Sequence, residues 1–212
     1  MSTTRKIPAE SNPGSHAKGQ KRFDKIVECA LQLLIERGYH NFSMRKVADA
    51  AGISIGNLQY YFPCKDALVE AMLDNTLQAY NELFNEIRHR GTPRQQFIEL
   101  VTAVTRDLGT RKTTVFFPEV WSLSNHEQAV TGMMDAMYDN YRHIVSDIIL
   151  EINPQLSAAQ ASRLALFFTC SIEGHTVFIG YKKPWNKETD NIANIATQSF
   201  LWLIEHGEIP ED

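Results

Sequence analysis

The chain has 212 residues, of which 43% are hydrophobic and 22% charged, a length and balance that suit a small domain followed by a larger domain with its own core. No apolar run approaches the ~20 residues of a membrane span, and the polar N-terminus lacks the apolar core of a signal peptide, so we expect a cytoplasmic protein without a membrane partner. The three cysteines, at positions 29, 64 and 170, are odd in number and far apart, which argues against a disulfide framework and against a metal knuckle.

Charge is divided unevenly along the chain, although the net charge is only −4. Residues 1–65 contain ten Lys or Arg and five Asp or Glu, a net charge of +5, whereas residues 66–212 contain eleven and twenty, a net charge of −9. This division indicates that the basic N-terminal part, residues 1–65, attracts phosphate groups and that the acidic part, residues 66–212, does not.

The first two expected elements are an arm and an amphipathic helix. Residues 1–20 contain two prolines and two glycines among scattered charges, which predicts a disordered basic arm. A helix is expected over residues 21–37 because apolar side chains recur there at helical spacing, and Gly38 ends it. The apolar positions are Phe23, Ile26, Val27, Ala30, Leu31, Leu33 and Leu34.

Residues 42–68 predict two short helices joined by a tight turn, in the sequence FSMRKVADAAGISIGNLQYYFPCKDAL. Ser43 and Ser54 are natural N-caps of the two helices, and Gly52 stands where the turn requires a left-handed backbone. The side chains expected to form the shared core are those of Val47, Ala48, Ala51, Ile53, Leu58 and Phe62. This arrangement is that of a DNA-binding helix-turn-helix, in which the second helix enters the major groove.

The rest of the chain predicts further helices and no strand, because no stretch alternates over enough residues. Pro93 suits the first turn of its helix, and Pro118 predicts that its helix is kinked or divided in two. Ser157 is expected to cap one helix, and Thr189 or Asp190 the last. The expected helices span residues 65–90, 93–108, 113–124, 126–152, 157–181 and 190–206.

The helix-turn-helix segment resembles the N-terminal domain of TetR/AcrR-family transcriptional regulators. The matching positions are Phe42–Ala48, Ala51–Ser54, Leu58, Tyr60–Pro63, Lys65, Ala67 and Leu68. The aromatic tail is more specific than the helix pair, since many all-α proteins contain an ordinary helical hairpin with glycine at its turn. The resemblance implies an all-α fold of about nine helices, with a three-helix DNA-binding domain over 21–66 and an effector-binding and dimerisation domain over 67–212.

The resemblance also implies which residues contact DNA. Those expected near base edges are Ile55, Gly56 and Gln59, with Met44 at the edge of the groove, while Arg45 can reach either a guanine edge or a phosphate. Those assigned to phosphates are Ser43, Ser54, Asn57, Tyr60, Tyr61 and Lys65. Two alternatives stay open, namely core packing for Tyr60 and a solvated surface charge for Lys65. Because Gln59 replaces the tyrosine that is common in the family, base preference cannot be transferred at that position. Basic residues of the arm either lie along DNA or belong to a solvated tail.

Useful affinity for a palindromic operator requires two DNA-binding domains. Family members supply them as a homodimer, in which the last two long helices of each chain pair. The matching segments are residues 157–181 and 190–206, whose apolar content exceeds one buried face. The alternative is a fully buried monomer core. The apolar residues concerned are Leu164, Leu166, Phe167, Phe168, Ile172, Phe178, Ile192, Ile195, Phe200, Leu201, Leu203 and Ile204.

The resemblance implies a small-molecule pocket in the second domain, suited to an apolar or aromatic ligand, or to a cation held by Trp or Tyr. Candidate lining residues are Phe97, Phe116, Phe117, Trp121, Met133, Met137, Tyr141, Phe168 and Phe178. The alternative for each is ordinary core packing. Arg106, Glu173 and His175 are candidate polar anchors, for which ordinary ion pairing is an equal explanation.

No enzyme motif is present: the sequence lacks HExxH, GxSxG, a phosphate-binding glycine loop and a CxxC pair, and the seven histidines form no metal spacing. We therefore predict no catalytic site, no cofactor and no metal. Repression is the default activity in the family, with activation as an alternative. A helical small-molecule carrier or scaffold without DNA binding is the competing hypothesis. Cys64, at a helix start beside Lys65, is either a redox-sensitive thiol or an inert one.

Overall fold

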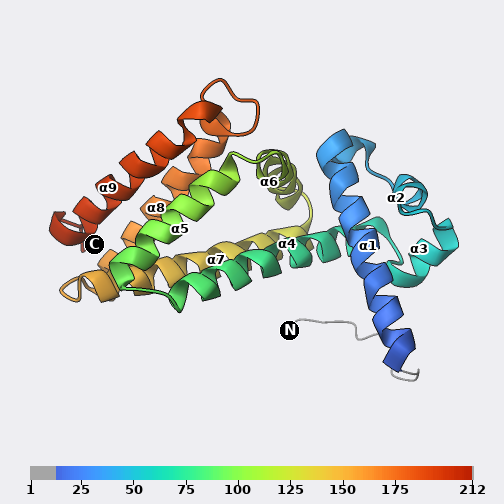
Figure 1. The fold of residues 1–212 in the computed structure, drawn as a ribbon, viewed down its shortest axis with the longest axis horizontal. Coiled ribbons are helices and arrows are strands. Elements are labelled where there is room, and N and C mark those ends of the chain that lie inside the picture. Colours follow the sequence, from blue (N-terminus) through green and yellow to red (C-terminus); the bar gives the residue numbers. More distant parts are fainter. Residues whose placement is uncertain (1–12, 212) are drawn as a thin grey trace. The chain divides into compact units, whose positions relative to one another are not determined.

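The computed structural model describes residues 13–211, and within them the chain forms nine α-helices and two short 3-10 helices, without a strand (Figure 1). This confirms the predicted all-α fold class. The chain divides into two compact units, Met1–Met72 and Leu73–Asp212. The division lies inside a helix, six residues beyond the expected boundary, because Leu68, Val69 and Met72 are buried with the first unit.

The first unit is built around the C-terminal half of its first helix. Its elements are α1 (Pro13–Arg37), η1 (Tyr39–Asn41), α2 (Met44–Ala51), α3 (Ile55–Tyr61) and the first turns of α4 (Lys65–Arg88). Ile26, Ala30 and Leu34 recur at helical spacing on α1 and are almost completely buried, and α1 packs along α2. This core holds the two short helices of the turn, which could not be stable alone at their length.

The first helix begins at Pro13, eight residues earlier than predicted. The expectation of a disordered arm is therefore wrong for residues 13–20, whereas residues 1–12 lie outside the described part of the chain. Proline at the first helical position loses no hydrogen bond, because the first amides of a helix have no intrahelical partner. Once residues 21–37 are helical, each added residue gains a backbone bond, and this outweighs the ~1 kcal/mol penalty of Gly19.

The second unit is a bundle in which α7 packs along α8 and α5 along α9 (Figure 1). Besides the rest of α4, its elements are α5 (Pro93–Leu108), α6 (Arg111–Ser124), α7 (Gln128–Ile152), α8 (Ala158–Ile179), η2 (Asn186–Glu188) and α9 (Thr189–His206). Its core includes Phe97, Leu100, Ile148 and Phe168, each with 0% of its surface exposed. The helices are thus held by one contiguous apolar cluster.

Most helix starts follow the capping rules that the sequence suggested. Pro93 occupies the first turn of α5, and Ser157 caps α8 by accepting a hydrogen bond from the amide of Gln160 at 3.2 Å. The last helix differs from prediction, because neither Thr189 nor Asp190 caps it. Helix η2 runs directly into α9, so Thr189 is already helical and its hydroxyl donates to the carbonyl of Asn186 at 2.5 Å.

Pro118 is expected to kink its helix or to divide it, and the division is wrong, since α6 is continuous from Arg111 to Ser124. The helix also begins earlier than expected, because Thr110 caps it by accepting from the amide of Thr113 at 3.2 Å. An interior proline removes a backbone bond and disfavours a helix by ~3 kcal/mol. Phe116 and Phe117, buried just before the proline, each stabilise the helix by ~1.5–3 kcal/mol through burial, which offsets that penalty.

Candidate nucleic-acid interface and effector cavity

The turn between α2 and α3 has the left-handed glycine that the sequence predicts. Gly52 has φ 67° and ψ 39°, and its amide donates to the carbonyls of Ala48 and Asp49. The amide of Ile53 then donates to the carbonyl of Ala48 at 3.0 Å, which closes the turn. A side chain at Gly52 would have to adopt a conformation that L-residues avoid, so the angle between the two helices depends on this glycine.

Both serines of the turn serve as caps. The hydroxyl oxygen of Ser43 accepts from the amide of Lys46 at 3.4 Å, and that of Ser54 accepts from the amide of Asn57 at 3.2 Å. Since each hydroxyl acts only as an acceptor in its cap, its own proton stays available to a further acceptor such as a phosphate oxygen.

Helix α3 has one buried side chain and an exposed outer face. Leu58 is completely buried, whereas Ile55 is 39% exposed and Tyr60 75% exposed. Gly56, Asn57 and Gln59 are exposed as well, as are Ser54 before the helix and Arg45 on α2, while Ser43, Met44 and Tyr61 are half-buried. Core packing, which was one interpretation of Tyr60, is therefore wrong. Within residues 13–211, no ion pair or side-chain hydrogen bond uses the guanidinium of Arg45 or the amide of Gln59.

Lys65 is not a solvated surface charge. Its Nζ atom lies 3.5 Å from the centroid of the Tyr39 ring and 5.6 Å from that of Phe42. Burial lowers the pKa of Lys65, while the neighbouring Asp66 raises it. The ammonium group thus joins the first turn of α4 to the aromatic core of the first unit through a cation–π contact.

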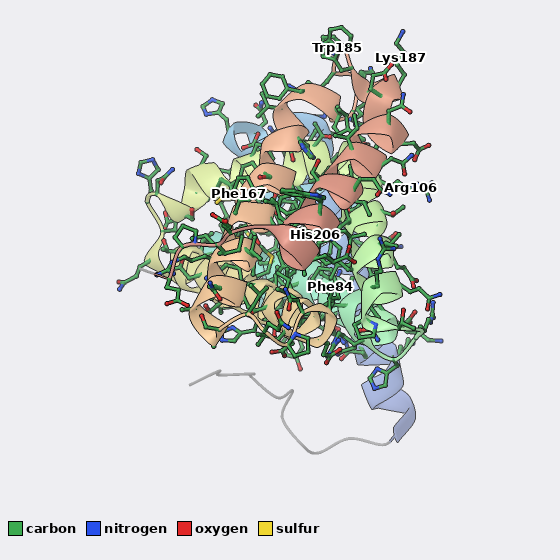
Figure 2. All side chains as sticks on the ribbon, turned by 90° about the vertical axis from the view of Figure 1, so that its left-hand side faces the viewer. Phe84, Arg106, Phe167, Trp185, Lys187 and His206 are labelled. Carbon is green, nitrogen blue, oxygen red and sulfur yellow. The ribbon has the colours of Figure 1, made fainter. Side chains whose placement is uncertain are left out.

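The second unit contains a cavity of about 30 Å³ between α4, α5, α6, α7 and α8. It is lined by Tyr80, Asn81, Phe84, Val104, Asp107, Leu108, Phe117, Met137, Tyr138, Tyr141 and Glu173. Figure 2 shows Phe84 inside the bundle and Arg106 on its outer side. A cavity of this volume holds about one water molecule. It is far smaller than the ~300 Å³ of the smallest typical ligand pockets, so a ligand can enter only if the lining helices or side chains move.

Three of the nine predicted ligand-binding residues line this cavity, namely Phe117, Met137 and Tyr141. Trp121 does not line the cavity but contacts a residue that does, because its indole nitrogen donates to the hydroxyl of Tyr138 at 2.9 Å. The structure places the others elsewhere: Phe97, Phe116 and Phe168 are buried in the apolar core, Met133 is half-buried outside the lining, and Phe178 is 63% exposed on the outer face of α8. Phe178 is not part of the cavity wall, so its assignment as a ligand-binding residue is corrected.

Two carboxyl groups belong to the cavity wall. Asp107 accepts hydrogen bonds from the hydroxyl of Tyr80 and, at 2.7 Å, from that of Thr113. Burial raises the pKa of Glu173 to about 7, a hydrogen bond with Tyr138 opposes that shift, and the charge of Asp107 adds to it. Burial and the charge of Asp107 likewise raise the pKa of Tyr80 far above its ordinary value.

Sequence reasoning identified Glu173 as a candidate anchor but missed Tyr80, Asp107 and Tyr138. The available signal was a carboxylate three residues after Val104 on the apolar face of α5, where a charged side chain is rare. The other two candidate anchors do not line the cavity. Arg106 forms an exposed ion pair with Asp190 at 2.9 Å, and His175 is half-buried with an Nδ1 atom that has no hydrogen-bond partner.

Residues 26–72 match the family described as bacterial regulatory proteins, tetR family. The match spans the buried half of α1, the whole helix-turn-helix and the first turns of α4. The chain belongs to the TetR family of helix-turn-helix transcriptional regulators. Proteins of this family bind DNA and are not enzymes.

Relatives of this TetR-family regulator are transcriptional regulators too. An uncharacterised regulator in the dhlA 5′ region of Xanthobacter autotrophicus is 26% identical over 170 residues, which cover 78% of this chain and 83% of that protein. RutR of Escherichia coli K12 is 33% identical over 85 residues, which cover 39% of this chain and 40% of RutR.

Two solved structures show the same fold over nearly the whole chain. A TetR-family regulator from Mesorhizobium loti has a TM-score of 0.72 at 12% identity, covering 88% of this chain and 98% of that one. A regulator from Saccharomonospora viridis in complex with choline has a TM-score of 0.71 at 21% identity, covering 91% and 100%.

The TetR-family regulator exposes large apolar side chains along α8 and α9. Leu166, Phe167 and Phe178 on α8 are 50%, 55% and 63% exposed, and Ile195 and Trp202 on α9 are 62% and 59% exposed. The apolar excess of these helices is therefore not wholly buried within one chain. Among the described residues, no cluster of His, Cys, Asp and Glu is arranged to hold a metal ion, and no helix combines the length and apolar character that crossing a membrane requires.

Proposed function

We propose that this TetR-family regulator represses transcription by binding a palindromic operator as a homodimer, and that a small apolar or aromatic ligand in the second unit releases it. The observation that carries the proposal is the exposed face of α3, where Ile55, Asn57 and Gln59 point away from a core that buries Leu58. A short helix presented in this way fits the major groove, with its first residues toward the base edges.

The exposed side chains have chemistry that suits base reading. Gln59 pairs with adenine through its amide, Ile55 contacts a thymine methyl group, and the unpaired guanidinium of Arg45 reaches a guanine edge or a phosphate. Gly56 brings the backbone of α3 close to the bases. A Cβ atom built on Gly56 would meet nothing within 4 Å in the free protein, so packing does not require glycine at this position.

Phosphate contacts come from groups that surround this face. The hydroxyls of Ser43 and Ser54 have protons available, and the largely exposed Tyr60 offers a third hydroxyl. Met44, Asn57, Tyr61 and Lys65 complete the proposed contact set. The ammonium of Lys65 has three N–H groups, so its position over the Tyr39 ring leaves donors for a phosphate.

A second copy of the chain supplies the second helix-turn-helix. The exposed apolar side chains on α8 and α9 support a homodimer formed through these helices, because isolated monomers rarely expose so many large apolar groups on neighbouring elements. The ring of Phe167 lies 5.4 Å from that of Phe200, so the outer face of α8 is continuous with the core contacts of α9. Two heads on one palindrome bind with the affinity that a single helix-turn-helix lacks.

Helix α4 supports the proposed response to ligand. The same continuous helix carries Lys65 at its first turn and Tyr80 and Phe84 in the cavity wall. Because the cavity holds about one water molecule, a ligand must displace lining groups, and contact with Tyr80 and Phe84 gives it a means of displacing α4.

The experiment is footprinting of the DNA upstream of the protein's own gene, with the wild type and the Arg45→Ala variant. We expect the wild type to protect a palindrome and the variant to lose at least about fivefold in affinity for it, since a bidentate base contact contributes ~1–3 kcal/mol. Arg111→Ala is the matched control, because Arg111 is an exposed arginine of the second unit. Equal affinity of Arg45→Ala and Arg111→Ala would refute the assigned role, and protection of a site without two-fold symmetry would refute the dimeric operator.

A further inference from the structure

We infer that the cavity of the second unit is a site for an organic cation, an amine or quaternary ammonium compound held between aromatic rings and the carboxylates of Asp107 and Glu173. The inference rests on the proposed function, which makes this cavity the effector site, and it goes further by assigning the charge of the effector.

The two carboxyl groups reach the cavity from different helices, α5 and α8, and neither has a cationic partner. None of the ion pairs found within residues 13–211 includes Asp107 or Glu173. Their hydrogen bonds come from neutral hydroxyls, those of Tyr80 and Thr113 on Asp107 and that of Tyr138 on Glu173. Two acids beside one buried space repel each other, and a bound cation removes that repulsion.

Aromatic rings form much of the remaining wall. The rings of Phe84 and Tyr141 are stacked with centroids 5.0 Å apart, and Tyr80 lies 6.2 Å from Phe84 and 5.8 Å from Phe117. The faces of such rings attract cations, and the attraction grows when water is excluded. Aromatic rings together with uncompensated carboxylates favour a positive ligand over a neutral one and oppose an anion.

One polar atom in the wall has no partner. The side chain of Tyr141 is only 4% exposed, and its hydroxyl makes no hydrogen bond among the described residues, although the residue lines the cavity. A buried hydroxyl without a partner is unfavourable by ~1–3 kcal/mol, so native proteins seldom keep one without a reason. The N–H group of an amine, or a water that accompanies a quaternary ammonium ligand, supplies the missing partner.

Glu173 makes the affinity for a cation depend on pH. Burial raises its pKa to about 7, so near neutrality the free protein holds Glu173 in both protonation states, and a cation favours the ionised one. The ionisable groups that face Glu173 are Asp107 from α5, Tyr80 from α4, and Tyr138 and Tyr141 from α7. The tyrosines stay protonated at neutral pH because burial raises each pKa further. On α8 itself, burial lowers the pKa of His175 and moves its titration toward acid.

The test is isothermal titration calorimetry of the full chain with benzyltrimethylammonium, with its uncharged carbon isostere neopentylbenzene and with benzenesulfonate. We expect the cation to bind at least tenfold more tightly than the isostere, the sulfonate not to bind, and the cation affinity to rise about tenfold between pH 6 and pH 8. Equal affinities of the cation and the isostere, or no binding of the cation at millimolar concentration, would overturn the inference.

Variants identify the groups responsible. Glu173→Gln keeps the size of the side chain and should lower cation affinity at pH 8 at least tenfold while abolishing most of the pH dependence. Asp107→Asn should also lower cation affinity, and Asp135→Asn, an exposed position on α7, should not. If Asp107→Asn fails to fold, Glu173→Gln alone decides: unchanged cation affinity in that variant contradicts the inference.

Operator binding measured in parallel separates this inference from the proposed function. Release of DNA by the neutral isostere but not by the cation would leave the effector role standing and would remove the cationic assignment. Tight cation binding that leaves operator affinity unchanged would support the cation site and would remove the proposed release.

Discussion

Replacing Glu173 by glutamine should stabilise the second unit at alkaline pH and leave it nearly unchanged in acid. The pKa of Glu173 in the folded protein is about 7, against an ordinary value of 4.5, because burial disfavours its charged form. Between these two values the folded protein holds a proton that the unfolded chain has released. The stability of the wild type therefore falls as pH rises from about 4.5 to about 7, and glutamine, which does not titrate, removes that fall.

The interval from 4.5 to about 7 sets the size of the effect. At ~1.4 kcal/mol per pKa unit, it corresponds to a ceiling of about 3.5 kcal/mol at pH 8.5. Because the Glu173 side chain is half-buried and keeps some contact with water, we expect about 1–2 kcal/mol. At pH 5, where the protonated acid and the amide are nearly equivalent in the folded state, the difference should be below ~1 kcal/mol.

The measurement is urea unfolding of the wild type and Glu173→Gln at pH 5.0 and pH 8.5, followed by far-ultraviolet circular dichroism. Other groups titrate over this range, but they titrate in both proteins and cancel in the difference between them. Glu208→Gln, an exposed position, is the control and should change stability by less than about 0.5 kcal/mol at either pH. A stability difference between Glu173→Gln and the wild type that is the same at both pH values would refute the argument from burial.

Three further predictions concern DNA binding and assembly. Gly56→Ala should leave thermal stability unchanged or raise it slightly, because a Cβ atom there meets nothing within 4 Å. Gel shifts should nevertheless show at least tenfold weaker operator binding. Full operator binding by this variant would mean that α3 does not approach the bases closely. Lys65→Ala should weaken DNA binding almost equally for all sequences and reduce the salt dependence of binding. It should also destabilise the first unit by ~0.5–1 kcal/mol, because the cation–π contact is lost. Lys187→Ala, at an exposed position, should change neither DNA binding nor stability. Phe178→Glu should convert the dimer into monomers in sedimentation experiments, and Ala136→Glu on the exposed side of α7 should not; a monomeric wild type would contradict the proposed interface.

The helix-turn-helix was predictable because its determinants are local. Gly52, Ser43 and Ser54 act through backbone atoms at most a few residues away, so their spacing in the sequence already defines the turn. The exposed side of α3 follows from one residue, since a short helix that buries Leu58 must present its other positions to solvent. Resemblance to a family added the DNA-contacting roles, which geometry alone does not supply.

The cavity was less predictable because it is a property of several helices together. Periodicity shows that Phe117 and Phe168 face inward, but it does not show that one borders an empty space and the other fills the core. The contact between Tyr80 and Asp107 joins residues 27 positions apart, and no local rule pairs them. The helix start at Pro13 and the undivided helix at Pro118 escaped prediction for a related reason. Helix propensity at a proline is a local quantity, and the adjoining helix at Pro13 and the burial of side chains near Pro118 outweigh it.

Substitution of Glu173, one of the two acids in the cavity, is expected to change stability and ligand affinity in opposite directions. A residue kept for packing loses stability and, through it, activity when it is changed, so both measurements fall together. Glu173→Gln is expected to gain stability at alkaline pH and to lose affinity for a cation under the same conditions, because a half-buried charge without a cationic partner weakens the fold and attracts the ligand. Opposite signs in the two assays would identify Glu173 as a ligand-binding group, and a loss in both would make it a structural one.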